Sequence, residues 1–195
     1  MRVIDKDELK LNVMEYVSLV EKGVVFIYGT DTIYGLGCNA IDEKAVNKLR
    51  DIKGRHNAPY SVIAPSKEWI RLNCEITSEA EKWLEKLPGP YTLILKLKRK
   101  NAVAESVTKG LDTIGVRIPD HWVSKFVGAL GFPIITTSVN KTDQEFMTSI
   151  DDLDHDIRAA VHFVVDEGKI EGHPSTIVHL DKKDVKVIDR KDQTH

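Results

Sequence analysis

Short apolar runs alternate with helix-type segments along the whole 195-residue chain. The runs at 24–28 and 133–137 are rich in β-branched residues, have the length of strands, and are each followed by a small residue. Between them, Asp42 and Gly54 bracket a helical apolar pattern, as an N-cap and a closing glycine would. This alternation favours an α/β fold with a mixed, twisted sheet flanked by helices, and we expect one domain over 1–195.

The same patterns predict the other elements of the chain. Helices are expected over 7–21, 42–54, 67–73, 78–87 and 121–130. Strands are expected over 24–28, 60–64, 92–97, 114–118, 133–137, 161–165, 176–180 and 185–188. The polar, Gly-rich stretch 29–40 is expected to connect a strand to a helix without regular structure of its own.

Composition narrows the class of protein. Hydrophobic residues make up 42% and charged residues 30%, which is typical of a soluble globular protein, and the formal net charge is −2. A dedicated nucleic-acid binder usually has a basic surface, so any RNA contact should be local. Cys38 and Cys74 are too few for a zinc site or a disulfide framework. No secretion signal or membrane span is evident, so we expect a cytoplasmic protein.

Several expected strands end in hydroxyl-bearing or cationic residues, and ligands in α/β sheets tend to lie where strands give way to loops. Ser138 and Asn140 are two residues apart, so in extended chain they point the same way and could hold one ligand together. The alternative is an ordinary strand-to-turn exit. The stretch 29–37 is likewise either a ligand-contacting loop or a simple Gly-rich turn.

Cations at two places indicate anion binding. Lys53 and Arg55 follow a helix and could both face a triphosphate, although a solvated helix end is the alternative. Arg117 lies inside an apolar strand, where it needs either a ligand carboxylate or an internal ion pair. The basic run 96–100 is typical of a solvated strand end. Neither the GxxxxGK[ST] nor the GxGxxG phosphate-binding motif occurs.

Taken in order, the motifs resemble the YrdC-like family of threonylcarbamoyl-adenylate synthases. The matching pieces are TDTIYGLG (30–37), KGR with a following Pro (53–59), PGPYTLIL (88–95), TIGVRIPDH (113–121), PIITTSVN (133–140), STIV (175–178) and Arg190. The resemblance implies a single α/β domain with a large concave basic groove. It also implies an enzyme that joins L-threonine, bicarbonate or CO2, and ATP into threonylcarbamoyl-AMP, with release of pyrophosphate. A separate transferase complex then uses this product to modify tRNA next to the anticodon.

The resemblance also implies roles for particular residues. Lys53 and Arg55 resemble the family's basic, catalytic pair at the nucleotide. Further ATP contacts fall on Thr113, Ser138, Asn140, Thr148 and Arg190. Threonine contacts fall on Thr32, Arg117, Thr136 and Ser175, with Arg117 holding the carboxylate. Mg²⁺ is expected to arrive bound to ATP, and no metal site made of protein ligands is expected.

This sequence departs from the family pattern after Asn140, where it has Lys141-Thr142-Asp143 in place of the usual Ser-Gly. The chain also ends soon after Arg190, so we expect no additional C-terminal domain. Three other functions remain open: a non-catalytic module of the same fold that binds double-stranded RNA or tRNA, a carbamoyl-adenylate enzyme with another substrate, as in hydrogenase maturation, and a degenerate regulatory relative. Retention of Lys53, Arg55, Ser138 and Asn140 argues against the last.

Overall fold

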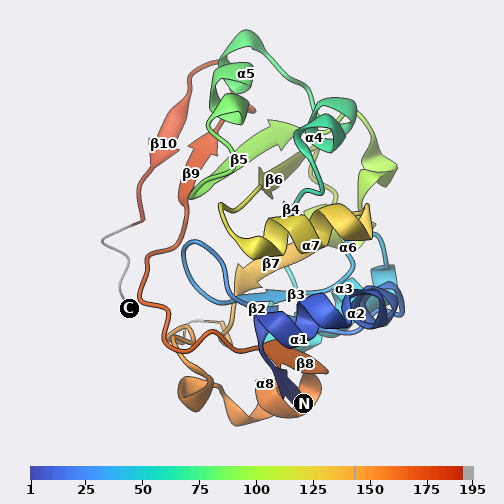
Figure 1. The fold of residues 1–195 in the computed structure, drawn as a ribbon. Helices are drawn as coiled ribbons and strands as arrows, with labels where there is room; N and C mark the ends of the chain where they lie inside the picture. The colour runs from blue at the N-terminus through green and yellow to red at the C-terminus, as the bar shows by residue number, and fades with distance from the viewer. Residues whose placement is uncertain (143, 191–195) are drawn as a thin grey trace.

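The structure is a computed structural model that describes residues 1–142 and 144–190. Within these residues, ten strands form a mixed sheet in the order β1-β8-β2-β3-β7-β4-β6-β5-β9-β10 (Figure 1). The strands are β1 (Arg2–Ile4), β2 (Phe26–Tyr28), β3 (Gly35–Gly37), β4 (Ser61–Ile63), β5 (Tyr91–Lys96), β6 (Thr113–Arg117), β7 (Ile134–Ser138), β8 (Phe163–Val165), β9 (Thr176–His179) and β10 (Lys186–Ile188).

Helices lie on both faces of the sheet (Figure 1). They are α1 (Lys6–Leu11), α2 (Val13–Glu21), α3 (Glu43–Lys53), α4 (Lys67–Asn73), α5 (Ser78–Glu85), α6 (Glu105–Thr108), α7 (Trp122–Leu130) and α8 (His155–Ala160), with 3₁₀ turns η1 (Lys100–Ala102) and η2 (Ile150–Asp152). No helix in the described ranges is long and apolar enough to cross a membrane.

Side-chain alternation along the strands divides the core between the two faces. In β2, Phe26 and Tyr28 pack with α1, α2 and α7, whereas Ile27 packs on the opposite face with α3. In β8, Phe163 and Val165 likewise face one side and Val164 the other. The predicted α/β fold with a mixed sheet is therefore confirmed.

The single helix expected over 7–21 is wrong, because it is broken at Asn12 into α1 and α2; the other predicted elements are present with ends shifted by a few residues, but some elements were missed. Within the stretch 29–40 expected to be irregular, β3 pairs with both β2 and β7. Its glycines are needed because a Cβ on Gly35 or Gly37 would lie 2.9 or 2.8 Å from the Tyr28 ring. Low intrinsic strand propensity is overridden here by close packing. The other missed elements are β1, α6, α8 and the two 3₁₀ turns.

The two faces are not covered equally. The helices α1, α2 and α7 cover the face over β8, β2 and the first part of β7, where Ile134 is buried. Further along the same face, Thr136 pairs with Ser61, and Ser61 pairs with Gly115. These short side chains, continued toward Thr92 on β5, leave that part of the face open.

Candidate active site

A cavity of about 300 Å³ lies on this open part of the sheet. Its floor is made by residues of one face of β3, β7, β4, β6 and β5, and its rim by loops. The lining residues are Thr30, Thr32, Ile33, Tyr34, Gly35, Arg55, Pro59, Tyr60, Ser61, Thr92, Arg117, Thr136, Thr137, Ser138, Asn140, Gln144, Phe146, Pro174, Ser175, Ile177 and Arg190. The site therefore extends across the sheet face, whereas the sequence suggested only strand ends.

The lining carries positive charge. Among the described residues, it includes Arg55, Arg117 and Arg190 together with many hydroxyl groups, and it includes no Asp or Glu. Burial lowers the pKa of Arg190, and the nearby charge of Arg117 lowers it further. Three arginines on the wall of one cavity favour an anionic ligand, although the charge of Arg117 is paired with that of Asp31.

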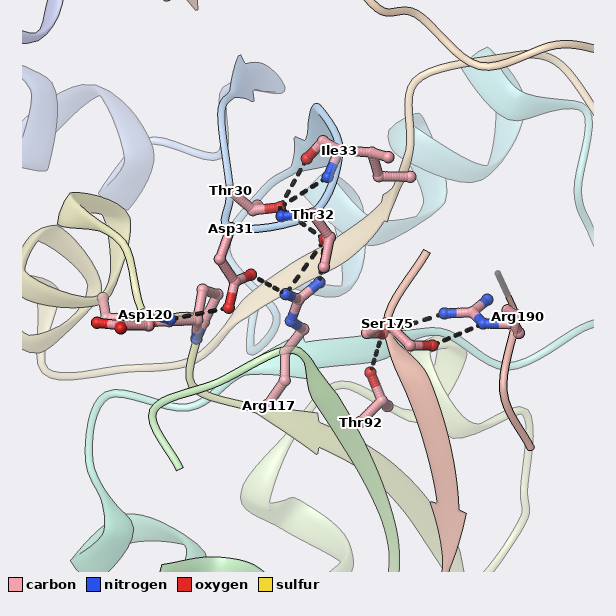
Figure 2. Close-up of polar contacts among 11 residues, drawn as sticks. Thr30, Asp31, Thr32, Ile33, Thr92, Arg117, Asp120, Ser175 and Arg190 are labelled. Carbon is pink, nitrogen blue, oxygen red and sulfur yellow. Dashed lines mark hydrogen bonds and ion pairs between the residues drawn. The ribbon is translucent and has the colours of Figure 1, made fainter. Parts of the chain in front are cut away.

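Arg117 is held by an internal ion pair (Figure 2). The residue is 5% exposed, and its Nη2 lies 2.5 Å from Oδ1 of Asp31. The other oxygen of Asp31 accepts the backbone N–H of Asp120 at 2.9 Å, which ties the 30–33 turn to the loop after β6. Nη1 and Nη2 also donate to the Thr32 hydroxyl at 3.3 Å, while the buried Nε has no partner among the described residues. The internal ion pair left open by the sequence is thus present, and Nε retains a free donor.

The turn that carries Asp31 is fixed by the Thr30 side chain (Figure 2). The Thr30 hydroxyl donates to the carbonyl of Ile33 at 2.7 Å and accepts the backbone N–H groups of Thr32 and Ile33. Chain 166–174 packs directly against this turn, since a Cβ on Gly172 would lie only 1.9 Å from the Thr32 carbonyl oxygen. The turn is therefore preorganised from both sides.

Ser175 links the sheet to the C-terminal segment (Figure 2). Its hydroxyl lies 2.7 Å from that of Thr92 on β5, and both residues are 4% exposed. Arg190 donates to the Ser175 carbonyl at 2.7 Å and to its hydroxyl at 3.1 Å. Arg190 is thereby held at the cavity wall although it follows the last strand.

Lys53 is buried beside Ser138 and Asn140. It is 2% exposed, and its Nζ donates to the Ser138 carbonyl and to Asn140 Oδ1, each at 2.7 Å. The Ser138 hydroxyl donates to the same Oδ1 at 2.6 Å, so Ser138 and Asn140 do point the same way. Burial lowers the pKa of Lys53 to about 7, with a further contribution from the charge of Arg55. The alternative that Lys53 is a solvated residue at the end of a helix is therefore wrong.

Eight of the residues that the sequence singled out lie on the cavity wall: Arg55, Ser138, Asn140, Arg190, Thr32, Arg117, Thr136 and Ser175. Lys53 lies directly behind Ser138 and Asn140. Thr113 and Thr148 are not in the lining; Thr113 begins β6, and the hydroxyl of Thr148 donates to Asp152 at 2.5 Å. Asp143 of the divergent segment lies outside the described residues.

Sequence reasoning missed lining residues such as Tyr60 and Thr92. Thr92 has the same signature as Arg117, since it is a polar residue in an apolar strand. Tyr60 directly follows Pro59, and burial raises its pKa to about 12. Within the described ranges, no group of His, Cys, Asp or Glu is placed to hold a metal.

Comparison with known proteins shows to which family the chain is related. A family model named Sua5/YciO/YrdC, described as "Telomere recombination", matches residues 18–190. A Methanocaldococcus jannaschii protein, provisionally named threonylcarbamoyl-AMP synthase, is 37% identical over 93% of this chain and 86% of its own. The threonylcarbamoyl-AMP synthase of Pyrococcus abyssi is 33% identical over 84% of this chain, which spans about half (49%) of that relative.

Solved structures agree with the sequence comparison. The crystal structure of P. abyssi Sua5 complexed with L-threonine superposes with a TM-score of 0.84 at 29% identity. The superposition covers 95% of this chain and 56% of the P. abyssi chain. The resemblance drawn from the motifs is confirmed: this chain belongs to the Sua5/YciO/YrdC family.

Proposed function

We propose that this chain is an L-threonylcarbamoyladenylate synthase, which forms threonylcarbamoyl-AMP and pyrophosphate from L-threonine, bicarbonate or CO2, and ATP. One observation carries the proposal: a cavity lined by Arg55, Arg117 and Arg190 and by hydroxyl groups, with the amine of Lys53 directly behind it. Such a site suits a substrate pair that brings a triphosphate and a carboxylate. The names of the M. jannaschii and P. abyssi relatives support the same activity.

The proposed reaction needs no nucleophile from the protein; it needs the substrates to be positioned and their charge to be neutralised. The threonine amine adds to CO2 and loses a proton, which gives a carbamate. A carbamate oxygen then attacks the α-phosphorus of ATP, the bond to the β-phosphate bridging oxygen breaks, and pyrophosphate leaves. Lys53, Arg55 and Arg190 would offset phosphate charge, because fixed cations aimed at developing negative charge lower the barrier.

The two substrates would share the cavity. To the nucleotide we assign Lys53, Arg55, Ser138, Asn140 and Arg190, with Thr113 and Thr148, which lie outside the lining, as further contacts. To threonine we assign Thr32, Arg117, Thr136 and Ser175. The position of Arg117 in the lining supports this assignment, since a guanidinium binds a carboxylate well.

Pyrophosphate release from ATP tests the activity. Release is expected only when L-threonine, bicarbonate and Mg²⁺ are all present. Pyrophosphate release that does not depend on L-threonine would overturn the substrate assignment. If the folded protein releases none but binds tRNA in a salt-dependent way, the RNA-binding alternative holds.

Serine is expected to be a poor but detectable substrate. It lacks the methyl group of threonine, and one methyl in a pocket is worth about 1–3 kcal/mol of discrimination. We therefore expect kcat/KM for serine to be about 10- to 200-fold below that for threonine, measured by pyrophosphate release. Equal values would remove Thr32 and Ser175 from the threonine site.

Binding of ATP is expected to take up a proton through Lys53. With its pKa lowered to about 7, the amine is mostly neutral at pH 8, and nearby phosphate would stabilise its charged form. Uptake should approach one proton per ATP at pH 8 and shrink at pH 6, so affinity should fall as pH rises above 7. Calorimetry in two buffers of different ionisation enthalpy measures the uptake. Lys53→Met is the matched control, and equal uptake by both proteins would remove Lys53 from the phosphate site.

We further propose that the product serves tRNA modification next to the anticodon, in the cytoplasm, through a separate transferase complex. Transient tRNA contact is compatible with the net charge of −2 only if it is local. An assay that supplies the product to such a complex and measures threonylcarbamoyladenosine in tRNA tests this step.

A further inference from the structure

Arg50 is a buried cation that the proposed chemistry does not use. It lies on α3 and is 2% exposed, on the same helix face as Leu49 and Lys53. Its hydrogen bonds within the described residues all end on backbone carbonyl oxygens. Burial lowers its pKa. A guanidinium placed this way needs a structural reason, because burying a charge is unfavourable unless its donors are satisfied.

The donors of Arg50 fasten the loop that carries Arg55. Nη1 donates to the carbonyl of Arg55 at 2.8 Å and to that of Ala58 at 2.9 Å, so one nitrogen bridges both ends of the loop. Nε donates to the carbonyl of Ser106 at 2.9 Å, and Nη2 donates to the same oxygen. Arg50 thus joins α3, the 55–58 loop and α6 in one network.

Tyr60 completes the arrangement at the end of the loop. The Arg50 guanidinium lies over the Tyr60 ring at 4.5 Å from its centroid, and the Arg55 guanidinium lies at 5.2 Å. Tyr60 and Arg55 both line the cavity, whereas Arg50 does not. The ring is therefore a shared platform between a buried cation and the cation at the cavity wall.

We infer that Arg50 is a positioning residue for the nucleotide side of the site: it fixes the 55–58 loop and the Tyr60 ring, and through them the place of the Arg55 guanidinium. The inference rests on the proposed function in taking ATP as the ligand. It extends that function by naming a residue that affects the affinity for ATP without contacting the nucleotide. The side chain of Arg55 makes one hydrogen bond among the described residues, to the Pro59 carbonyl at 3.3 Å, so the place of its guanidinium depends on its backbone and on Tyr60.

Lysine could not replace Arg50 in this role. The planar guanidinium reaches three carbonyl groups in different directions, whereas an ammonium is a point charge on a flexible stem. Arg50→Lys keeps the charge and removes the fork, so it separates positioning from electrostatics. Arg71→Lys, at an arginine held by Glu81 and Glu85 far along the chain, is the matched control.

The test combines ligand affinity with proteolysis. Calorimetry measures Kd for MgATP and for L-threonine, and limited trypsin digestion with mass spectrometry measures cleavage after Arg55. Arg50→Lys should raise Kd for ATP about tenfold to a hundredfold, because misplacing a contact by about 1 Å has effects of that size. It should speed cleavage after Arg55 and change Kd for threonine less than threefold, and Arg71→Lys should change none of these.

Other outcomes separate the inference from the proposed function. If Arg50→Lys alters neither ATP affinity nor cleavage, or weakens ATP binding with cleavage unchanged, the positioning role is wrong. If the wild type binds no ATP yet Arg50→Lys speeds cleavage, the loop is positioned by Arg50 and the proposed function fails. Arg50→Gln, which buries no charge, replaces Arg50→Lys if that variant does not fold, with threonine binding as the check on folding.

Discussion

Replacing Lys53 by alanine is expected to abolish most pyrophosphate release while leaving the protein folded. Losing a buried cation at a charged site typically costs about 2–5 kcal/mol, which lowers kcat/KM about 30-fold to several thousand-fold. Stability should change little, because Asn140 Oδ1 keeps the Ser138 hydroxyl as a donor at 2.6 Å when the amine is gone. Burying the charged amine is also unfavourable, which is why its pKa is lowered to about 7, so removing it relieves that desolvation cost.

The matched control is Lys48→Ala, which removes an exposed lysine from the same helix. It should leave turnover unchanged, since surface charges away from a site have small effects. Thermal unfolding of both variants checks folding. Turnover by Lys53→Ala at the wild-type rate would exclude Lys53 from the chemistry, and unfolding of that variant would show that its role is structural.

Much of the cavity floor could be predicted from alternation within the strands. In β6 the sequence Thr-Ile-Gly-Val-Arg places Thr113, Gly115 and Arg117 on one face and apolar residues on the other. The register of the neighbouring strands pairs Ser61 with both Gly115 and Thr136, so these residues share that face. Only strand order was needed to join these faces into one surface, and strand order is set by contacts between residues far apart in sequence.

The sequence also held a signal for Arg50 that periodicity alone did not resolve. Buried positions on α3 recur at Val46, Leu49, Arg50 and Lys53, so both cations fall on its inward face. A basic residue there is either a surface residue at the edge of the apolar stripe or a buried donor. Deciding between them requires the carbonyl groups of Ser106 and the 55–58 loop, which only the fold brings together.

The Asp31–Arg117 pair illustrates the same limit. Arg117 needed a partner, and the sequence offered no means to choose between a ligand and one of many carboxylates. The contact spans 86 positions and depends on the turn built by Thr30. The partner is internal, yet Arg117 also lines the cavity, so an internal ion pair and contact with a ligand do not exclude each other.

Arg117→Lys is expected to raise KM for threonine about a hundredfold or more, with a much smaller change in KM for ATP. An ammonium could still pair with Asp31, but it offers no second, planar edge to a carboxylate. Losing a charge-assisted, bidentate contact at a desolvated site costs about 2–5 kcal/mol. Initial-rate kinetics of pyrophosphate release, with each substrate varied in turn, measures the two KM values.

Asp31→Asn separates substrate binding from the internal pair. Removing one partner of a buried ion pair costs about 3–5 kcal/mol of stability, so this variant should unfold at lower temperature. The carboxamide still accepts the Asp120 N–H, and Arg117 keeps its charge, so KM for threonine should change less than tenfold. If both variants lose stability and neither alters KM, Arg117 serves the fold alone. If KM rises only in Arg117→Lys, the guanidinium holds the threonine carboxylate.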